Sequence, residues 1–87
     1  MTYAVEIKPS ALATLKRLPK GIAARISNKI ELLSHEQRPH GVEKLAGEEN
    51  LYRIRMGDYQ IVYQIQDKSS QVLVLRIGHR KEVYRAL

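Results

Sequence analysis

The stretch that decides the fold runs from Leu51 to Leu87 and reads LYRIRMGDYQIVYQIQDKSSQVLVLRIGHRKEVYRAL. As far as Ile77, its apolar residues alternate with arginine and glutamine. A period of two residues is typical of a strand that buries one face and leaves the other polar. The stretch therefore predicts a sheet whose second face carries positive charge, and such a face suits the binding of phosphate.

Turn signals divide this stretch into three short strands. We predict them at residues 51–56, 59–66 and 71–78. Gly57-Asp58 is a Gly-X pair of the kind found in two-residue hairpin turns, and the residues from Asp67 to Ser70 are rich in turn formers. The three strands are therefore expected to form an antiparallel meander.

The side-chain period also assigns each strand residue to one face of the sheet. The face expected to pack on the helices comprises Tyr52, Ile54, Met56, Tyr59, Ile61, Tyr63, Ile65, Leu73, Leu75 and Ile77. The other face is expected to show Arg53, Arg55, Gln60, Val62, Gln64, Val72, Val74 and Arg76.

The turns also predict which residues lie opposite one another. A two-residue turn at Gly57-Asp58 places Arg55 opposite Gln60. A second loop that preserves the face assignment has an odd number of residues, and the simplest one places Arg76 opposite Gln60 as well. Arg55, Gln60 and Arg76 are then expected in one row, with Arg80 at the same end of the sheet. Cations held this close together favour a bound anion.

The first half of the chain predicts a strand followed by two helices. Residues 3–7 alternate until Pro9, where the period becomes helical, and Pro19 ends this first helix. Its apolar face comprises Ala11, Leu12, Leu15 and Leu18, and that of the second helix comprises Ile22, Ile26, Ile30 and Leu33. Two helices joined by so short a turn form an αα hairpin.

The two polar segments that follow read as connections. Residues 34–42 are expected to form a loop, and residues 43–50 a second connection with a short extended piece at 44–45. The expected fold class is therefore α+β: an N-terminal strand, an αα hairpin, and an antiparallel three-strand meander packed on the helices. All of it is expected to form a single domain over residues 1–87.

Composition excludes several classes of protein. Fifteen Lys and Arg against nine acidic residues give a net charge of +6, which favours polyanions, although many basic proteins are merely soluble. No apolar run approaches a bilayer span, no secretory signal is expected, and the absence of cysteine is compatible with a reducing cytosol. His35 and His40 have no third ligand nearby, so neither a metal nor another cofactor is expected.

The chain closes on the segment GHRKEVYR, residues 78–85, which gathers a histidine, basic residues and a tyrosine directly after the last predicted strand. The order of strand, two helices, meander and this tail resembles the RelE/ParE toxin superfamily. LYRIRMGDYQIVYQI and VLRIGHRKEVY resemble its RelE branch. The resemblance covers essentially the whole chain, and it implies a short C-terminal helical tail.

The resemblance also implies an activity and its partners. A RelE-like toxin of a type II toxin–antitoxin system enters the ribosomal A site and cuts mRNA there without a metal, which inhibits translation and arrests growth. The 2′-hydroxyl attacks the adjacent phosphate and leaves a 2′,3′-cyclic phosphate and a 5′-hydroxyl. The implied partners are a cognate antitoxin, the ribosome and mRNA, with operator DNA contacted only through the antitoxin. No membrane partner is expected.

Site residues carry over by position in this sequence. Arg53 and Arg55 fall where the family has two lysines, Gln60 where it has a basic residue, and Arg80 and Tyr84 on the arginine and tyrosine of the tail. A guanidinium is a poor general base because its pKa lies above about 12. The expected catalytic residues are Arg53, Arg55, His79, Arg80 and Tyr84, with His79 as the base that arginine cannot supply. The expected phosphate-binding residues are Arg55, Gln60, Arg76 and Lys81.

Two other readings remain open at the level of sequence. A ParE-like protein shares the fold and inhibits DNA gyrase without cutting RNA, and the arginine and glutamine at positions 53 and 60 leave that reading open. The chain also fits a catalytically weak RNA-binding or ribosome-binding module. The basic residues of the helices could contact ribosomal RNA or simply be solvated.

Overall fold

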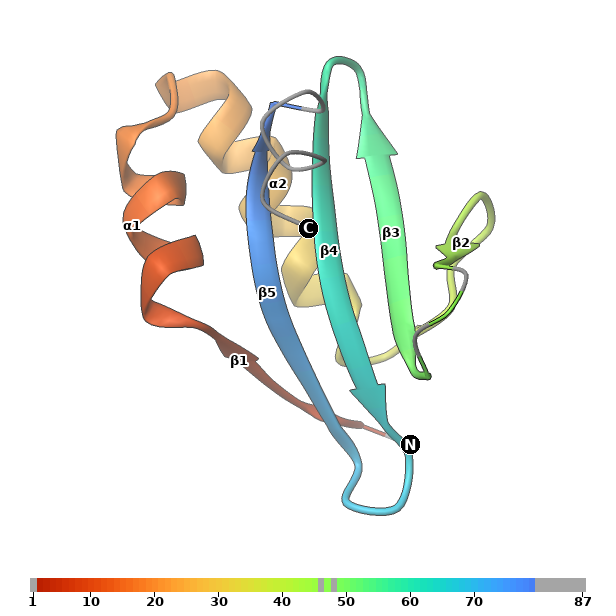
Figure 1. The fold of residues 1–87 in the computed structure, drawn as a ribbon. Coiled ribbons are helices and arrows are strands. Elements are labelled where there is room, and N and C mark those ends of the chain that lie inside the picture. The colour runs from red at the N-terminus through yellow and green to blue at the C-terminus, as the bar shows by residue number, and fades with distance from the viewer. Residues whose placement is uncertain (1, 46, 48, 80–87) are drawn as a thin grey trace.

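The protein folds as a five-stranded sheet with two helices packed on one face (Figure 1). The computed structural model describes residues 2–45, 47 and 49–79 of the 87. In chain order the elements are β1 (Ala4–Ile7), α1 (Pro9–Arg17), α2 (Lys20–Leu32), β2 (Glu43–Lys44), β3 (Leu51–Met56), β4 (Tyr59–Gln66) and β5 (Gln71–His79). The predicted α+β class is confirmed, and the predicted helical tail lies outside the described residues.

The helical hairpin forms where its prolines predict it. Pro9 begins α1, where its missing N–H is not needed, and Pro19 caps the start of α2. Within α1, Leu15 is buried, but Leu12 is 37% exposed and not part of the core as predicted. The buried face of α1, which contacts β5, is formed by Ala11 and Leu15. Successive helix residues are about 100° apart, so Leu12 lies to one side of this face and at the margin of the contact.

The sheet extends beyond the predicted meander at both edges. Its strand order is β1-β5-β4-β3-β2, so the N-terminal strand closes one edge and the two residues of β2 close the other. β1 pairs parallel with β5, with Val5 beside Val72. β2 pairs antiparallel with β3, with Glu43 beside Arg53, and it starts one residue before the extended piece predicted at 44–45.

The β3–β4 pairing follows the prediction, and the β4–β5 pairing does not. Arg55 lies opposite Gln60, as a two-residue turn requires. The next loop has four residues, because Gln71 lies opposite Gln66. A register shift at Val62 and the following residue then adds one residue to β5, so Arg76 lies opposite Val62 and not opposite Gln60.

The register change also corrects the predicted faces of β5. Val72 and Val74 pack in the core under the helices with no exposed surface, whereas Leu73 lies on the other face, opposite Gln64. A loop with an even number of residues exchanges the two faces of β5 relative to the prediction. The bulge exchanges them back before Arg76, which therefore lies on the predicted face. The core comprises Ala11, Leu15, Ile26, Ile30, Leu33, Tyr52, Ile54, Ile61, Tyr63, Ile65, Val72, Val74 and Ile77.

A polar clamp fixes the end of the sheet where β4 meets β5. The Arg38 guanidinium pairs with Asp67 at 2.8 Å and donates a hydrogen bond from Nε to the Tyr52 hydroxyl at 3.2 Å. The Tyr3 hydroxyl donates to the same carboxylate at 2.7 Å. Arg38 first and Tyr3 second hold the pKa of Asp67 below its usual range. The clamp thus joins four segments that are distant in sequence.

Candidate functional site: a cationic face of the sheet

The face of the sheet away from the helices gathers the polar residues predicted as a phosphate site. We call it the arginine face and define it by Arg53 and Arg55 of β3, Gln60 of β4 and Arg76 of β5. The register places Arg53, Val62 and Arg76 in one row and Arg55, Gln60 and Gly78 in the next. The predicted row of Arg55, Gln60 and Arg76 is therefore wrong in detail, although all three share the face.

This row structure sets how closely the arginines approach. Arg53 and Arg76 flank Val62 from the two neighbouring strands, so their backbones are about 10 Å apart at the usual strand spacing. Arginine side chains are long enough to bring their guanidinium groups closer than that. The face therefore carries three cations within two neighbouring rows.

The arginine face is less open than its sequence pattern predicts. Gln60 and Val62 have no exposed surface, and Arg53 is only 9% exposed. The side chain of Arg55 is 45% exposed. Removing a guanidinium from water is costly unless an opposite charge and hydrogen bonds compensate it. Arg53 therefore needs an anion nearby.

That anion is Glu43 on the edge strand β2. One carboxylate oxygen, Oε2, lies 2.6 Å from Nη2 of Arg53, and the other, Oε1, lies 3.6 Å from Nε of Arg55. The hydrogen bond from Arg53 is the main cause that lowers the pKa of Glu43, and the charges of both arginines add to it. The carboxylate therefore stays ionised at neutral pH.

Glu43 escaped the sequence-based prediction because it belongs to a segment that reads as a polar connection. Its position one residue before the predicted extended piece was the available signal. If that piece pairs with β3, alternation places Glu43 on the same face as Arg53. The pairing joins residues across a loop, and nothing in the local sequence specifies it.

The Glu43 contact shows how the face handles an anion. A carboxylate and a phosphodiester both present two oxygens that accept hydrogen bonds from guanidinium groups. Glu43 already accepts such a hydrogen bond from Arg53 and forms an ion pair with Arg55. The same donors therefore suit a phosphate as well as a carboxylate.

His79 lies apart from this set. It pairs with Tyr59 at the end of β5, and the two rings meet edge to face with centroids 5.8 Å apart. Directly paired residues share a face, and Tyr59 belongs to the face that packs on the helices. The structure therefore brings Arg53, Arg55, Gln60 and Arg76 together but leaves His79 on the opposite side. Arg80, Lys81 and Tyr84 lie outside the described residues.

Among residues 2–45, 47 and 49–79, no group of three His, Cys, Asp or Glu is placed to hold a metal ion. In the same part of the chain, no helix has the length and apolar character needed to cross a membrane.

Comparison with known proteins identifies the family. The family described as "ParE toxin of type II toxin-antitoxin system, parDE" matches residues 5–84. The chain is a toxin of the RelE/ParE superfamily. It is 34% identical to toxin RelG of Mycobacterium tuberculosis, with 98% of this chain and 99% of the relative covered. It is 37% identical to toxin RelE of the same organism, with 95% and 87% covered.

Solved toxin structures of this superfamily share the fold. The RelE chain of the archaeal RelE–RelB complex from Pyrococcus horikoshii superposes with a TM-score of 0.81 at 33% identity, covering 92% of this chain and 97% of that one. A mutant of E. coli toxin RelE in the free state gives a TM-score of 0.82 at 26% identity, covering 98% and 93%. The predicted membership of this superfamily is confirmed.

Proposed function

We propose that this toxin is a ribosome-dependent endoribonuclease that cuts mRNA in the A site through attack of a 2′-hydroxyl on the adjacent phosphate. The observation that carries the proposal is the arginine face, where two arginines already hold a carboxylate between them. The named relatives RelE and RelG, and solved complexes of RelE with RelB, support a toxin that a cognate antitoxin neutralises.

The reaction needs charge stabilisation more than anything else. Attack of the 2′-oxygen on phosphorus forms a new P–O bond and produces a dianionic phosphorane. Departure of the 5′-oxygen then breaks the P–O5′ bond. Fixed guanidinium groups stabilise that charge best when they are held in place before the reaction. Arg53, Arg55 and Arg76 supply this charge from adjacent strands. Gln60 lies opposite Arg55 and has no exposed surface, so a phosphate reaches its amide only if the face rearranges.

The proton of the 2′-hydroxyl needs an acceptor, and no arginine can serve because the pKa of a guanidinium is above about 12. Among the described residues that define or contact the arginine face, the acceptor is the carboxylate of Glu43. While it binds Arg53, its pKa is lowered and its basicity is weak. When a phosphate takes over the guanidinium donors, the carboxylate is released beside the reacting group and regains its ordinary basicity.

The residues of the tail complete the proposal as expected from the sequence. Arg80 adds charge at the phosphate, Tyr84 stacks on or orients a nucleotide, and Lys81 contacts the RNA backbone. The departing 5′-oxygen takes a proton from water, to which Glu43 returns the proton that it accepted, so the products are a 2′,3′-cyclic phosphate and a 5′-hydroxyl. No metal takes part in this scheme.

Inhibition of DNA gyrase is the second candidate, because the matching family carries the ParE description. A single pair of assays separates the two. A defined mRNA is translated in a purified system with the toxin, and cuts are mapped by primer extension; in parallel, gyrase supercoiling is measured with the same protein. The nuclease proposal expects cuts within A-site codons and unaffected supercoiling. Inhibited supercoiling without cuts contradicts it.

A further inference from the structure

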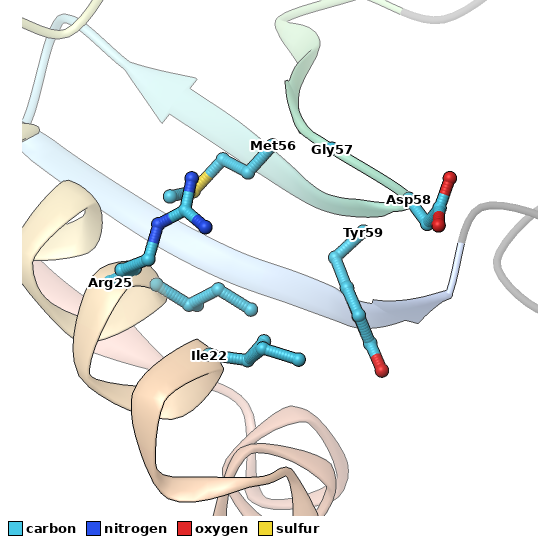
Figure 2. A pocket seen from close by; sticks show the side chains of 7 residues that line it. Ile22, Arg25, Met56, Gly57, Asp58 and Tyr59 are labelled. Atoms are coloured by element: carbon cyan, nitrogen blue, oxygen red, sulfur yellow. The ribbon is translucent and has the colours of Figure 1, made fainter.

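A pocket of about 200 Å³ opens between α2 and the turn that joins β3 to β4 (Figure 2). It lies on the helix side of the sheet, opposite the arginine face. Its lining residues are Ile22, Arg25, Ile26, Met56, Gly57, Asp58 and Tyr59. Most of this surface is apolar, so the pocket suits a bulky apolar side chain.

One cation stands at the rim of this pocket. Arg25 is exposed, and its guanidinium extends from α2 towards Met56, whereas the Asp58 carboxylate points away (Figure 2). Within the part of the chain that the structure describes, Arg25 makes no hydrogen bond or ion pair. An apolar cavity beside an uncompensated cation matches a ligand that carries an apolar group next to a negative charge.

The mouth of the pocket is accessible to a polypeptide backbone. Gly57 has φ +62°, and a Cβ placed on it would meet no atom within 4 Å. The turn therefore exposes its backbone without crowding the entrance. A partner chain can approach closely there while a side chain enters the cavity.

We propose that this pocket binds the antitoxin, with an apolar antitoxin side chain in the cavity and a neighbouring carboxylate on Arg25. The proposal rests on the proposed function in requiring that the toxin has an antitoxin. Charge favours an acidic partner because the toxin carries a net charge of +6. Arginine is enriched at protein–protein hot spots, whose anchoring side chains fill well-packed pockets.

RNA fits this pocket less well than an acidic peptide. A nucleic acid strand tracks a groove with several cations and stacks its bases on aromatic faces. Here one arginine lies over an aliphatic floor, and the ring of Tyr59 is already in contact with His79. The pocket is therefore assigned to the antitoxin, and the arginine face to RNA.

Methionine labelling tests this proposal directly. The chain has two methionines, Met1 and Met56, so a ¹³C-methyl-methionine spectrum contains one signal from the pocket. The titrant is the purified antitoxin, defined as the protein whose coexpression restores growth. We expect the Met56 signal to shift on saturation. An unchanged Met56 signal in a saturated complex overturns the proposal, and so does a shift caused by mRNA alone.

A charge reversal tests the role of Arg25. Arg25→Glu is expected to raise the antitoxin Kd at least tenfold at 150 mM salt, while Lys16→Glu, an equal charge change on exposed α1, changes it less than threefold. Both variants must show the wild-type thermal transition. If the two variants raise the Kd equally, Arg25 contributes only general charge attraction, and the proposal is overturned. Wild-type toxin that neither arrests growth nor binds any antitoxin instead contradicts the proposed function.

Discussion

Replacing Glu43 by glutamine removes the negative charge from the arginine face while keeping the size of the side chain. This carboxylate has two proposed roles, and they predict opposite effects on RNA binding and on RNA cleavage. As an anion bound by Arg53 and Arg55, Glu43 competes with RNA phosphate. As the proton acceptor, it is needed for cleavage. Glu43→Gln should therefore bind RNA more tightly and cleave it more slowly.

The magnitudes follow from charge and chemistry. Removing one compensating anion leaves one more protein cation for the RNA, so the slope of log K against log[salt] should steepen by about 0.7 for single-stranded RNA. General base catalysis usually contributes at least about 10²-fold. The single-turnover cleavage rate on programmed ribosomes should therefore fall by about 100-fold or more. Glu43→Asp, which keeps the charge, should retain the wild-type salt slope.

The assays are fluorescence titration of a short single-stranded RNA at several salt concentrations and single-turnover cleavage on ribosomes. Thermal unfolding of each variant controls for folding, because Arg53 is only 9% exposed and loses its anionic partner. Cleavage by Glu43→Gln within threefold of wild type would refute the role as proton acceptor. An unchanged salt slope would refute the competition with phosphate.

Three further predictions concern the base, the clamp and the helix packing. The pKa of Glu43 lies below its ordinary value while it binds the arginines and returns to that value, still well below pH 6, when it is released. Cleavage by wild type should therefore change little between pH 6 and 8. A base with the ordinary histidine pKa of about 6.5 would instead lose about fourfold at pH 6, which a pH–rate profile would show. Arg38→Ala removes an ion pair with the half-exposed Asp67, and a hydrogen bond and a ring contact with Tyr52, and it should cost about 1 to 2 kcal/mol in urea unfolding. Because the pKa of Asp67 is depressed, the share due to the ion pair is present at neutral pH and lost as pH falls through the folded-state pKa. A deficit that persists unchanged in acid would argue against the ion pair. Leu15→Ala should destabilise the fold by about 2 to 5 kcal/mol and Leu12→Ala by far less, and equal losses would contradict the position of α1.

Local signals predicted the elements and one register correctly. Pro9 and Pro19 bound the first helix, and the Gly57-Asp58 turn sets the pairing of β3 with β4. The predicted pairing of β4 with β5 is wrong because Ser70 adopts φ +54° and closes a four-residue loop, which a later bulge offsets. The even loop and the bulge cancel each other, so the alternation in β4 and at the end of β5 is the same as it would be without them. The sequence pattern therefore does not reveal either one.

The candidate site was predictable where it follows from one strand and not where it depends on pairing between strands. Alternation alone places Arg53 and Arg55 on one face of β3. The arrival of Glu43 beside them depends on the two-residue strand β2, which no periodicity identifies. β5 continues one residue beyond the predicted strand end, so His79 is part of the strand. The strand's alternation then places His79 on the face opposite the arginines.

The central claim is that the arginine face cleaves RNA. The most direct measurement compares wild type with Arg53→Ala/Arg55→Ala on ribosomes programmed with one defined mRNA, and determines both the cut positions and the chemistry of the new ends. We predict cuts in the A-site codon with 2′,3′-cyclic phosphate ends for wild type, and at least about a 100-fold slower reaction for the folded double variant. Undiminished cleavage by the double variant, or growth arrest by a wild-type protein that produces no such ends, would contradict the account.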